Sequence, residues 1–75
     1  MNEFILRLRV SPHVARACLE AIKPEIDSDI HGRSKVELKY DNELILTILA
    51  SDLHAMRAAV NTYVRWLDMC LKLVK

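Results

Sequence analysis

The sequence predicts an α+β domain with the order β-α-β-β-α, in which two helices pack on a small three-stranded antiparallel sheet. Three segments alternate apolar and polar residues with a period of two, which is typical of half-buried strands. Two further segments carry apolar residues at intervals of three and four, as amphipathic helices do. The chain has 75 residues, the length of one small domain. We therefore expect a single domain over residues 1–75.

The first strand and helix are expected in the N-terminal third. The strand is predicted over residues 4–10, and its inward residues are Phe4, Leu6, Leu8 and Val10. Ser11 is expected to cap a helix that begins at Pro12. Proline suits the first helical position, because the N–H that it lacks would have no hydrogen-bond partner there. Pro24 is expected to end this helix, because the residue before a proline avoids helical dihedral angles.

A polar loop over residues 24–32 is predicted to lead into a β-hairpin. The two strands are expected over residues 33–40 and 43–50, and Asp41-Asn42 forms a plausible tight turn because both residues tolerate positive φ. The inward residues of the last strand are Leu44, Leu46 and Ile48. Its other face is apolar as well, so we expect this strand to be covered on both sides.

A long C-terminal helix is predicted from a cap at Ser51 or Asp52 to about Leu73. Its apolar residues follow an a/d heptad pattern. They are Leu53, Met56, Val60, Tyr63, Leu67, Cys70 and Val74. Further apolar residues flank this stripe, which indicates two apolar faces and two partners, one of them another chain. The alternative is one wide stripe that faces the domain's own core, and periodicity alone leaves both interpretations open.

The composition favours association with another chain. Apolar residues make up 52% of the sequence, although a domain of this size buries only roughly 60% of the surface that its unfolded chain exposes. The net charge of +1 gives no overall field that would attract nucleic acid or a membrane. The sequence shows no signal-peptide pattern and no membrane-spanning run. Two cysteines without a disulfide framework fit a reducing compartment, so we expect a cytoplasmic protein.

The sequence predicts no catalytic residues, cofactor or metal site. Cys18 and Cys70 lie on apolar stripes, where cysteine acts as a small hydrophobic residue, so a small thiol enzyme is the least favoured hypothesis. Asp27, Asp29 and Gly32 match the start of an EF-hand loop. However, Leu38 occupies the position where a bidentate glutamate is needed, which excludes this calcium site. With a single glycine, the chain also has no phosphate-binding loop.

The outward face of the first two strands is locally basic. Its candidate contacts with RNA are Arg7, Arg9, Arg33 and Lys35, to which Lys39 adds a further cation. Such a stripe can contact phosphates, although Glu3 and Glu37 dilute it. It supports an alternative function, a free-standing nucleic-acid-binding module. An ordinary solvated sheet face is the other interpretation.

The C-terminal half resembles the Pcc family, the small dimerising subunit of the KEOPS complex. The resemblance rests on the Ala-Ser-Asp end of the last strand and on the segments Met-Arg-Ala-Ala and Asn-Thr-Tyr-Val of the helix (residues 56–59 and 61–64). These segments are similar to the family's "L-R-A-x-x-N-S-x-L" helix. The upstream strand, helix and hairpin agree with the family's element order, so the resemblance covers nearly the whole chain.

The resemblance implies a non-catalytic scaffold in a complex that places threonylcarbamoyl groups on transfer RNA. In the family, the small subunit forms a homodimer and holds the catalytic ATPase-fold subunit by helix packing. Contact with transfer RNA, indirect or weak, is a further implied property. The interface residues expected on this basis are Met56, Arg57, Val60, Asn61, Tyr63, Val64 and Leu67. Of these, Arg57 and Asn61 match polar positions of the family motif and are expected to orient the helix or reach a partner's backbone.

Overall fold

The computed structural model describes residues 1–28 and 34–73 and confirms the predicted element order. The five elements are β1 (Asn2–Leu8), α1 (Pro12–Ser28), β2 (Ser34–Tyr40), β3 (Leu44–Ala50) and α2 (Leu53–Leu73). Arg33 and the loop residues Asp29, His31 and Gly32 lie outside the described residues, as does Val74.

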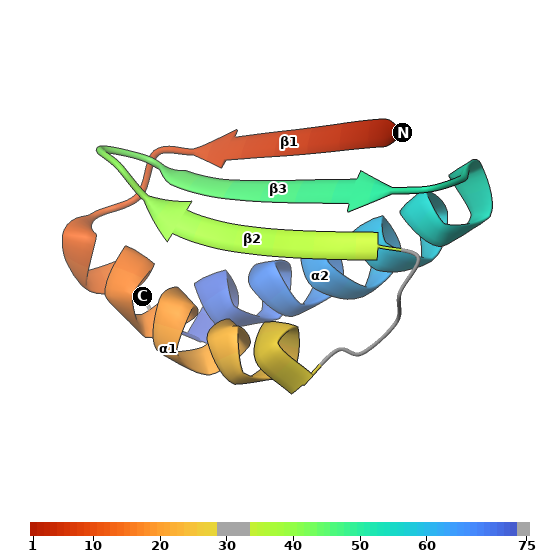
Figure 1. Ribbon diagram of the computed structural model, residues 1–75. Coiled ribbons are helices and arrows are strands. Elements are labelled where there is room, and N and C mark those ends of the chain that lie inside the picture. Colours follow the sequence, from red (N-terminus) through yellow and green to blue (C-terminus); the bar gives the residue numbers. More distant parts are fainter. Residues whose placement is uncertain (29–33, 74–75) are drawn as a thin grey trace.

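The three strands form one antiparallel sheet in the order β1-β3-β2, so the last strand is the central one (Figure 1). β1 and β2 both pair with β3 along their whole length, and Leu44 lies opposite Leu8 on one side and Tyr40 on the other. The chain thus leaves β1, forms α1, and returns on the far side of the sheet. β3 then fills the space between the two edge strands.

β1 and α1 differ from the predictions at their ends. The strand is shifted toward the N-terminus, but its alternation is as expected, with residues at even positions half-buried. Ser11 caps α1, since its Oγ accepts a hydrogen bond from the backbone N–H of Val14 at 3.3 Å. The prediction that Pro24 ends this helix is wrong, because the helix continues to Ser28. A proline ring fixes φ near a helical value, and the burial of Ile26 against the core favours one more turn.

The hairpin between β2 and β3 has the predicted turn chemistry. Asn42 adopts a positive φ of 63°, a conformation that asparagine tolerates better than most residues. The backbone N–H of Asp41 donates to the carbonyl oxygen of Glu43 at 2.9 Å. Glu43 therefore belongs to the turn, and β3 begins one residue later than predicted.

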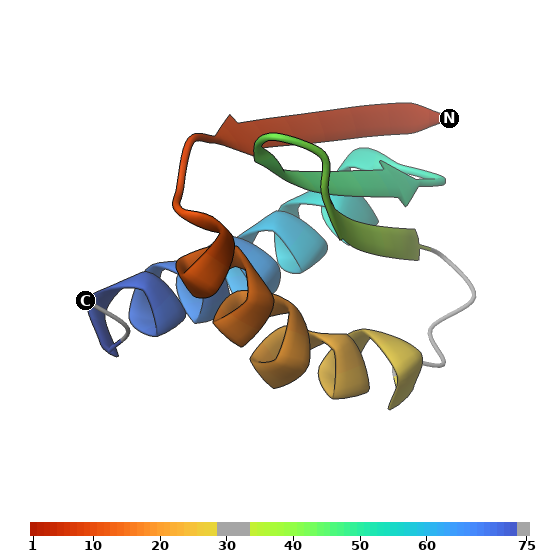
Figure 2. The same cartoon turned by 90° about the vertical axis from the view of Figure 1, so that its left-hand side faces the viewer.

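Both helices lie on the same face of the sheet (Figures 1 and 2). The core forms between this face and the helices, and its centre contains Ala15, Cys18, Ile22, Leu44, Leu46, Ile48, Ala59, Tyr63, Leu67 and Cys70. On the outer face of β3, no helix of the described residues covers the strand (Figures 1 and 2), so covering of that side by a further layer stays a prediction. Ile45 on the outer face is nevertheless buried, because Arg7 and Lys39 lie directly opposite it on the two neighbouring strands.

α2 begins at a cap formed by Asp52, one of the two predicted positions. Its Oδ1 accepts a hydrogen bond from the backbone N–H of Ala55 at 2.8 Å, and its carbonyl oxygen accepts one from Met56 at 3.0 Å. The helix then runs for 21 residues beneath the sheet. No helix formed by the described residues is long and apolar enough to cross a membrane.

Candidate protein-interaction surfaces

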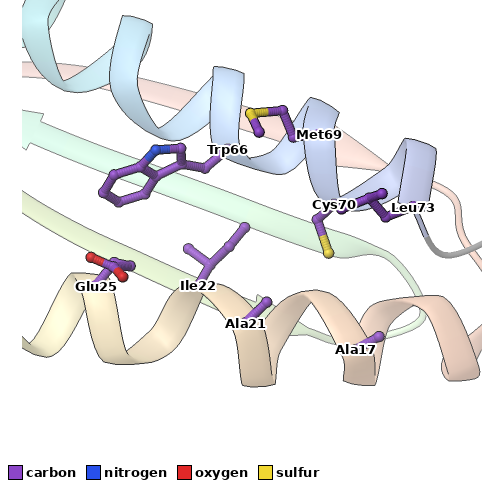
Figure 3. Close-up of a pocket in the computed structure, with 8 residues that line it drawn as sticks. All are labelled: Ala17, Ala21, Ile22, Glu25, Trp66, Met69, Cys70 and Leu73. Atoms are coloured by element: carbon purple, nitrogen blue, oxygen red, sulfur yellow. The ribbon is translucent and has the colours of Figure 1, made fainter.

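An open apolar groove lies between α1 and α2 (Figure 3). Its volume is about 410 Å³. The residues that line it are Ala17, Ala21, Ile22 and Glu25 from α1, and Trp66, Met69, Cys70 and Leu73 from α2. Trp66 and Cys70 project from α2 toward α1, and Ile22 projects in the opposite direction. Glu25 is the one charged residue of the lining, so the groove suits an apolar ligand surface.

The groove forms because small side chains on one helix face large ones on the other. Ala17 and Ala21 are four residues apart and therefore lie on the same side of α1. On α2, Met69 is 53% and Leu73 is 82% exposed, which is unusual for large apolar side chains. Exposed apolar residues that gather along one groove indicate an interaction site more strongly than scattered ones do.

The indole of Trp66 is held in place by an aromatic contact. Its ring meets that of Tyr63 edge to face, with a centroid distance of 5.3 Å and an interplanar angle of 80°. Tyr63 is itself buried in the core. A rigid, half-buried tryptophan at a groove gives a partner apolar contact area at little entropic cost.

The two thiols lie at the helix interface, and Cys70 also lines the groove. Burial raises the pKa of the Cys18 thiol to about 12, and a hydrogen bond with Cys70 and the charge of that neighbour act in the same direction. Cys18 therefore stays protonated at neutral pH, which is the opposite of what a nucleophilic cysteine requires. Among residues 1–28 and 34–73, no three His, Cys, Asp or Glu side chains are grouped so that they could hold a metal ion.

The seven α2 residues expected at a protein interface divide into three groups. Tyr63 and Leu67 are buried in the chain's own core, where they hold α2 on the sheet. Arg57 and Asn61 are exposed. The others, which are half-buried, are Met56, Val60 and Val64. The heptad stripe thus faces largely inward, and only its margin remains open to a partner.

α2 has two apolar flanks. Since successive residues of a helix are rotated by about 100°, Val60 and Val64 lie on the opposite side of the core stripe from Trp66 and Met69. The Trp66 flank borders α1 and forms the groove. α1 packs on β2, at one edge of the sheet, and α2 contacts β3 and β1, toward the other edge. The flank of α2 that faces away from α1, with Val60, therefore lies on the side of β1. Sequence patterning indicated two faces but not what each one meets.

The groove residues of α1 were not among the predicted sites. Ala17 and Ala21 give only a weak signal, because alanines four apart are common in helices. Their role follows from the position of α2, which lies far away in the sequence. A groove between two distant segments cannot be recognised until their packing is known.

The basic outer face is less concentrated than the sequence suggested. Arg7, Arg9 and Lys35 are exposed, whereas Arg33 lies outside the described residues. Lys35 and Glu3 lie at the same level of the sheet, on either side of β3. Arg7 is four residues further along β1, so the levels of Lys35 and Arg7 are roughly 13 Å apart along the strands. The guanidinium of Arg7 also forms an ion pair with Glu43 at 3.3 Å. Of the described candidates, Lys35 therefore lies apart from Arg7.

Comparison with known proteins places nearly the whole chain in one family. The family model described as "Transcription factor Pcc1" matches residues 4–75. No curated protein matches the sequence.

Proposed function

Because the chain belongs to the Pcc1 family, the family of a KEOPS subunit, we propose that it is the dimerising, non-catalytic scaffold of such a complex. In this function it holds the catalytic ATPase-fold subunit by helix packing and assists threonylcarbamoyladenosine modification of transfer RNA in the cytoplasm. The family is not known to be catalytic.

The observation that carries the proposal is the open apolar groove between α1 and α2. Helix-in-groove recognition uses an apolar channel of this kind, into which large side chains of a partner helix insert. Exposed Met69 and Leu73 gain most from being covered, because each would bury much of its apolar surface. We therefore assign the groove to the catalytic subunit.

The other flank of α2 is the proposed homodimer side. Val60 and Val64 leave part of their apolar surface in water, and Arg57 and Asn61 are exposed beside them. Met56 extends this half-buried margin toward the N-terminus of the helix. Tyr63 and Leu67 support the surface from beneath and touch no partner directly, since both are buried.

Two matched variants, each with one alanine replaced by glutamate, test the assignment of the groove. Ala21→Glu places a carboxylate in the groove, beside Glu25, whereas Ala58→Glu makes the same change at an exposed position of α2 that does not line it. Both positions are exposed, so both variants are expected to fold. We expect Ala21→Glu to weaken binding of the ATPase-fold subunit roughly a hundredfold or more, because a charge would be buried without a partner.

Binding is measured by isothermal titration calorimetry with the purified ATPase-fold subunit, and folding by circular dichroism. Ala58→Glu is expected to bind as the wild-type chain does. Equal affinity of the two variants would refute the groove as the docking site. A wild-type chain that fails to bind the ATPase-fold subunit at all would refute the scaffold function.

The transfer RNA contact is proposed as a weak one made by exposed cations of the outer face. Arg7, Arg9 and Lys35 are the described candidates, and phosphate contacts by such side chains depend strongly on salt. The alternative function, an independent nucleic-acid-binding module, requires tight binding of transfer RNA by the isolated chain. The interspersed Glu3, Glu37 and Glu43 favour the weaker contact.

A further inference from the structure

The fold brings the two cysteines of the chain into contact between α1 and α2. Cys18 lies four residues before Ile22, so both side chains lie on the same face of α1. Ile22 projects toward α2, and Cys70 projects from α2 toward α1 (Figure 3). The two thiols are hydrogen-bonded to each other. A pair of sulfurs in direct contact therefore lies at the interface of two helices that are far apart in the sequence.

The two thiols differ in their access to solvent. Cys70 lines the open groove and keeps 8% of its surface exposed. Cys18 has 0% exposed. A small reagent that enters the groove can thus reach the sulfur of Cys70, and the sulfur of Cys18 lies directly behind it. Redox-sensitive cysteines have this arrangement, in which one accessible thiol reacts first and a neighbouring thiol resolves the product.

The surroundings of the pair favour an uncharged product. Both cysteines belong to the apolar core, and burial raises the pKa of the Cys18 thiol to about 12. A soft metal ion would require both thiols as thiolates, which this site disfavours. A disulfide carries no charge and therefore suits the same site.

We propose that Cys18 and Cys70 form a reversible disulfide that joins α1 to α2 beside the groove when the chain is exposed to hydrogen peroxide. The inference goes beyond the proposed scaffold function, and its test needs no partner protein. A dithiol reductant restores the two thiols by thiol–disulfide exchange.

The oxidation has two steps. The Cys70 thiolate attacks one oxygen of hydrogen peroxide, so that an S–O bond forms and the O–O bond breaks, and the hydroxide that leaves becomes water with the proton lost by the thiol. The Cys18 sulfur then attacks the sulfur of this sulfenic acid, so that the S–S bond forms and the S–O bond breaks. The hydroxide that leaves takes the Cys18 proton and becomes a second water. In total, two thiols lose two protons and two electrons, and one peroxide becomes two waters.

The disulfide changes how firmly the helix pair is held. It closes a loop of roughly 50 residues, which lowers the conformational entropy of the unfolded chain and decreases the unfolding equilibrium constant by about a thousandfold. It also fixes the separation of the two helices that line the groove. In the reduced chain, non-covalent core contacts hold this separation.

Mass spectrometry of the peroxide-treated wild-type chain tests the proposal. We expect a single chain that has lost two hydrogen atoms, and peptide mapping without reductant is expected to link the peptides of Cys18 and Cys70. Mapping also separates this product from oxygen added to exposed methionines such as Met69. The midpoint of urea denaturation is expected to rise and to return when dithiothreitol is added. In the matched variant Cys18→Ala, Cys70 has no resolving thiol and is expected to gain oxygen instead.

Three results would overturn the disulfide: oxygen on Cys70 of the wild type without the loss of two hydrogens, a disulfide between two chains, or thiols that stay reduced under conditions that oxidise those of the urea-unfolded chain. An unchanged or lower midpoint of the oxidised chain would refute the stabilisation of the helix pair. Circular dichroism checks the folding of Cys18→Ala. The decisive measurements use the wild type, so they do not depend on that variant.

Discussion

The two faces of the central strand β3 are both apolar in sequence, yet they are buried by different means. Ile48, on the side of the helices, has 0% of its surface exposed, and Ile45, on the outer side, has 7%. Ile48 belongs to the core between the sheet and the helices, whereas Ile45 lies between Arg7 and Lys39 on the neighbouring strands, whose aliphatic stems can shield it. Similar burial can therefore reflect either packing between layers or lateral shielding within one layer.

The largest effect that we expect is a loss of folding stability, and it shows whether these two kinds of burial contribute differently to the free energy of unfolding. We expect Ile48→Ala to destabilise the chain by about 3–4 kcal/mol, because it leaves a cavity that the packed helices cannot fill. Ile45→Ala is expected to cost about 1–2 kcal/mol, since water and the aliphatic stems of Arg7 and Lys39 can occupy the space. Urea denaturation of both variants at one fixed chain concentration measures the difference. Equal losses would show that another layer covers the outer face.

Much of the fold could be predicted because its local signals are strong. The alternation of β1, the cap at Ser11 and the turn at Asn42 each depend on neighbouring residues alone. Pro24 misled the prediction, because the tertiary contact of Ile26 outweighed a local preference. The strand order was not predictable, since β1 and β2 have similar patterns and only packing decides which strand lies between them.

The candidate site was predictable only in part. The heptad pattern of α2 identified an apolar helix, but the same spacing fits a core stripe and a partner interface equally well. The structure assigns Tyr63 and Leu67 to the core and leaves Val60 and Val64 at its margin. The groove requires two helices whose facing residues are separated by most of the chain, so no local pattern contained it.

The helix-covered face also predicts a specific dependence of stability on pH. The pKa of Cys18 is raised from 9.0 to about 12, chiefly by burial, so the folded chain holds this proton more tightly than the unfolded chain does. The associated stabilisation is complete below pH 9 and is lost as the pH rises toward 12, because the unfolded chain binds fewer protons in that range. No such effect is expected from the outer face around Ile45.

The measurement is the midpoint of urea denaturation between pH 9 and 12 for the wild type and for Cys18→Ala. Lysine and tyrosine residues also titrate in this range, so the variant serves as the control for their contribution. We expect the wild type to lose stability more steeply than Cys18→Ala. Parallel curves would show that the Cys18 thiol is not held in its neutral form by the fold.

The smallest expected effect concerns the ion pair of the outer face. A guanidinium nitrogen of Arg7 lies 3.3 Å from Oε1 of Glu43, and the Arg7 side chain is largely exposed to solvent. We expect a double-mutant cycle with Arg7→Gln and Glu43→Gln to give a coupling free energy of about 0.5 kcal/mol or less, because water and salt screen such pairs. The cycle is measured by urea denaturation at a chain concentration below self-association, in low and in high salt. A larger coupling free energy that persists in high salt would show that this end of the outer face is shielded from solvent. The outer face and the helix-covered face would then differ less in solvent exposure than the single chain indicates.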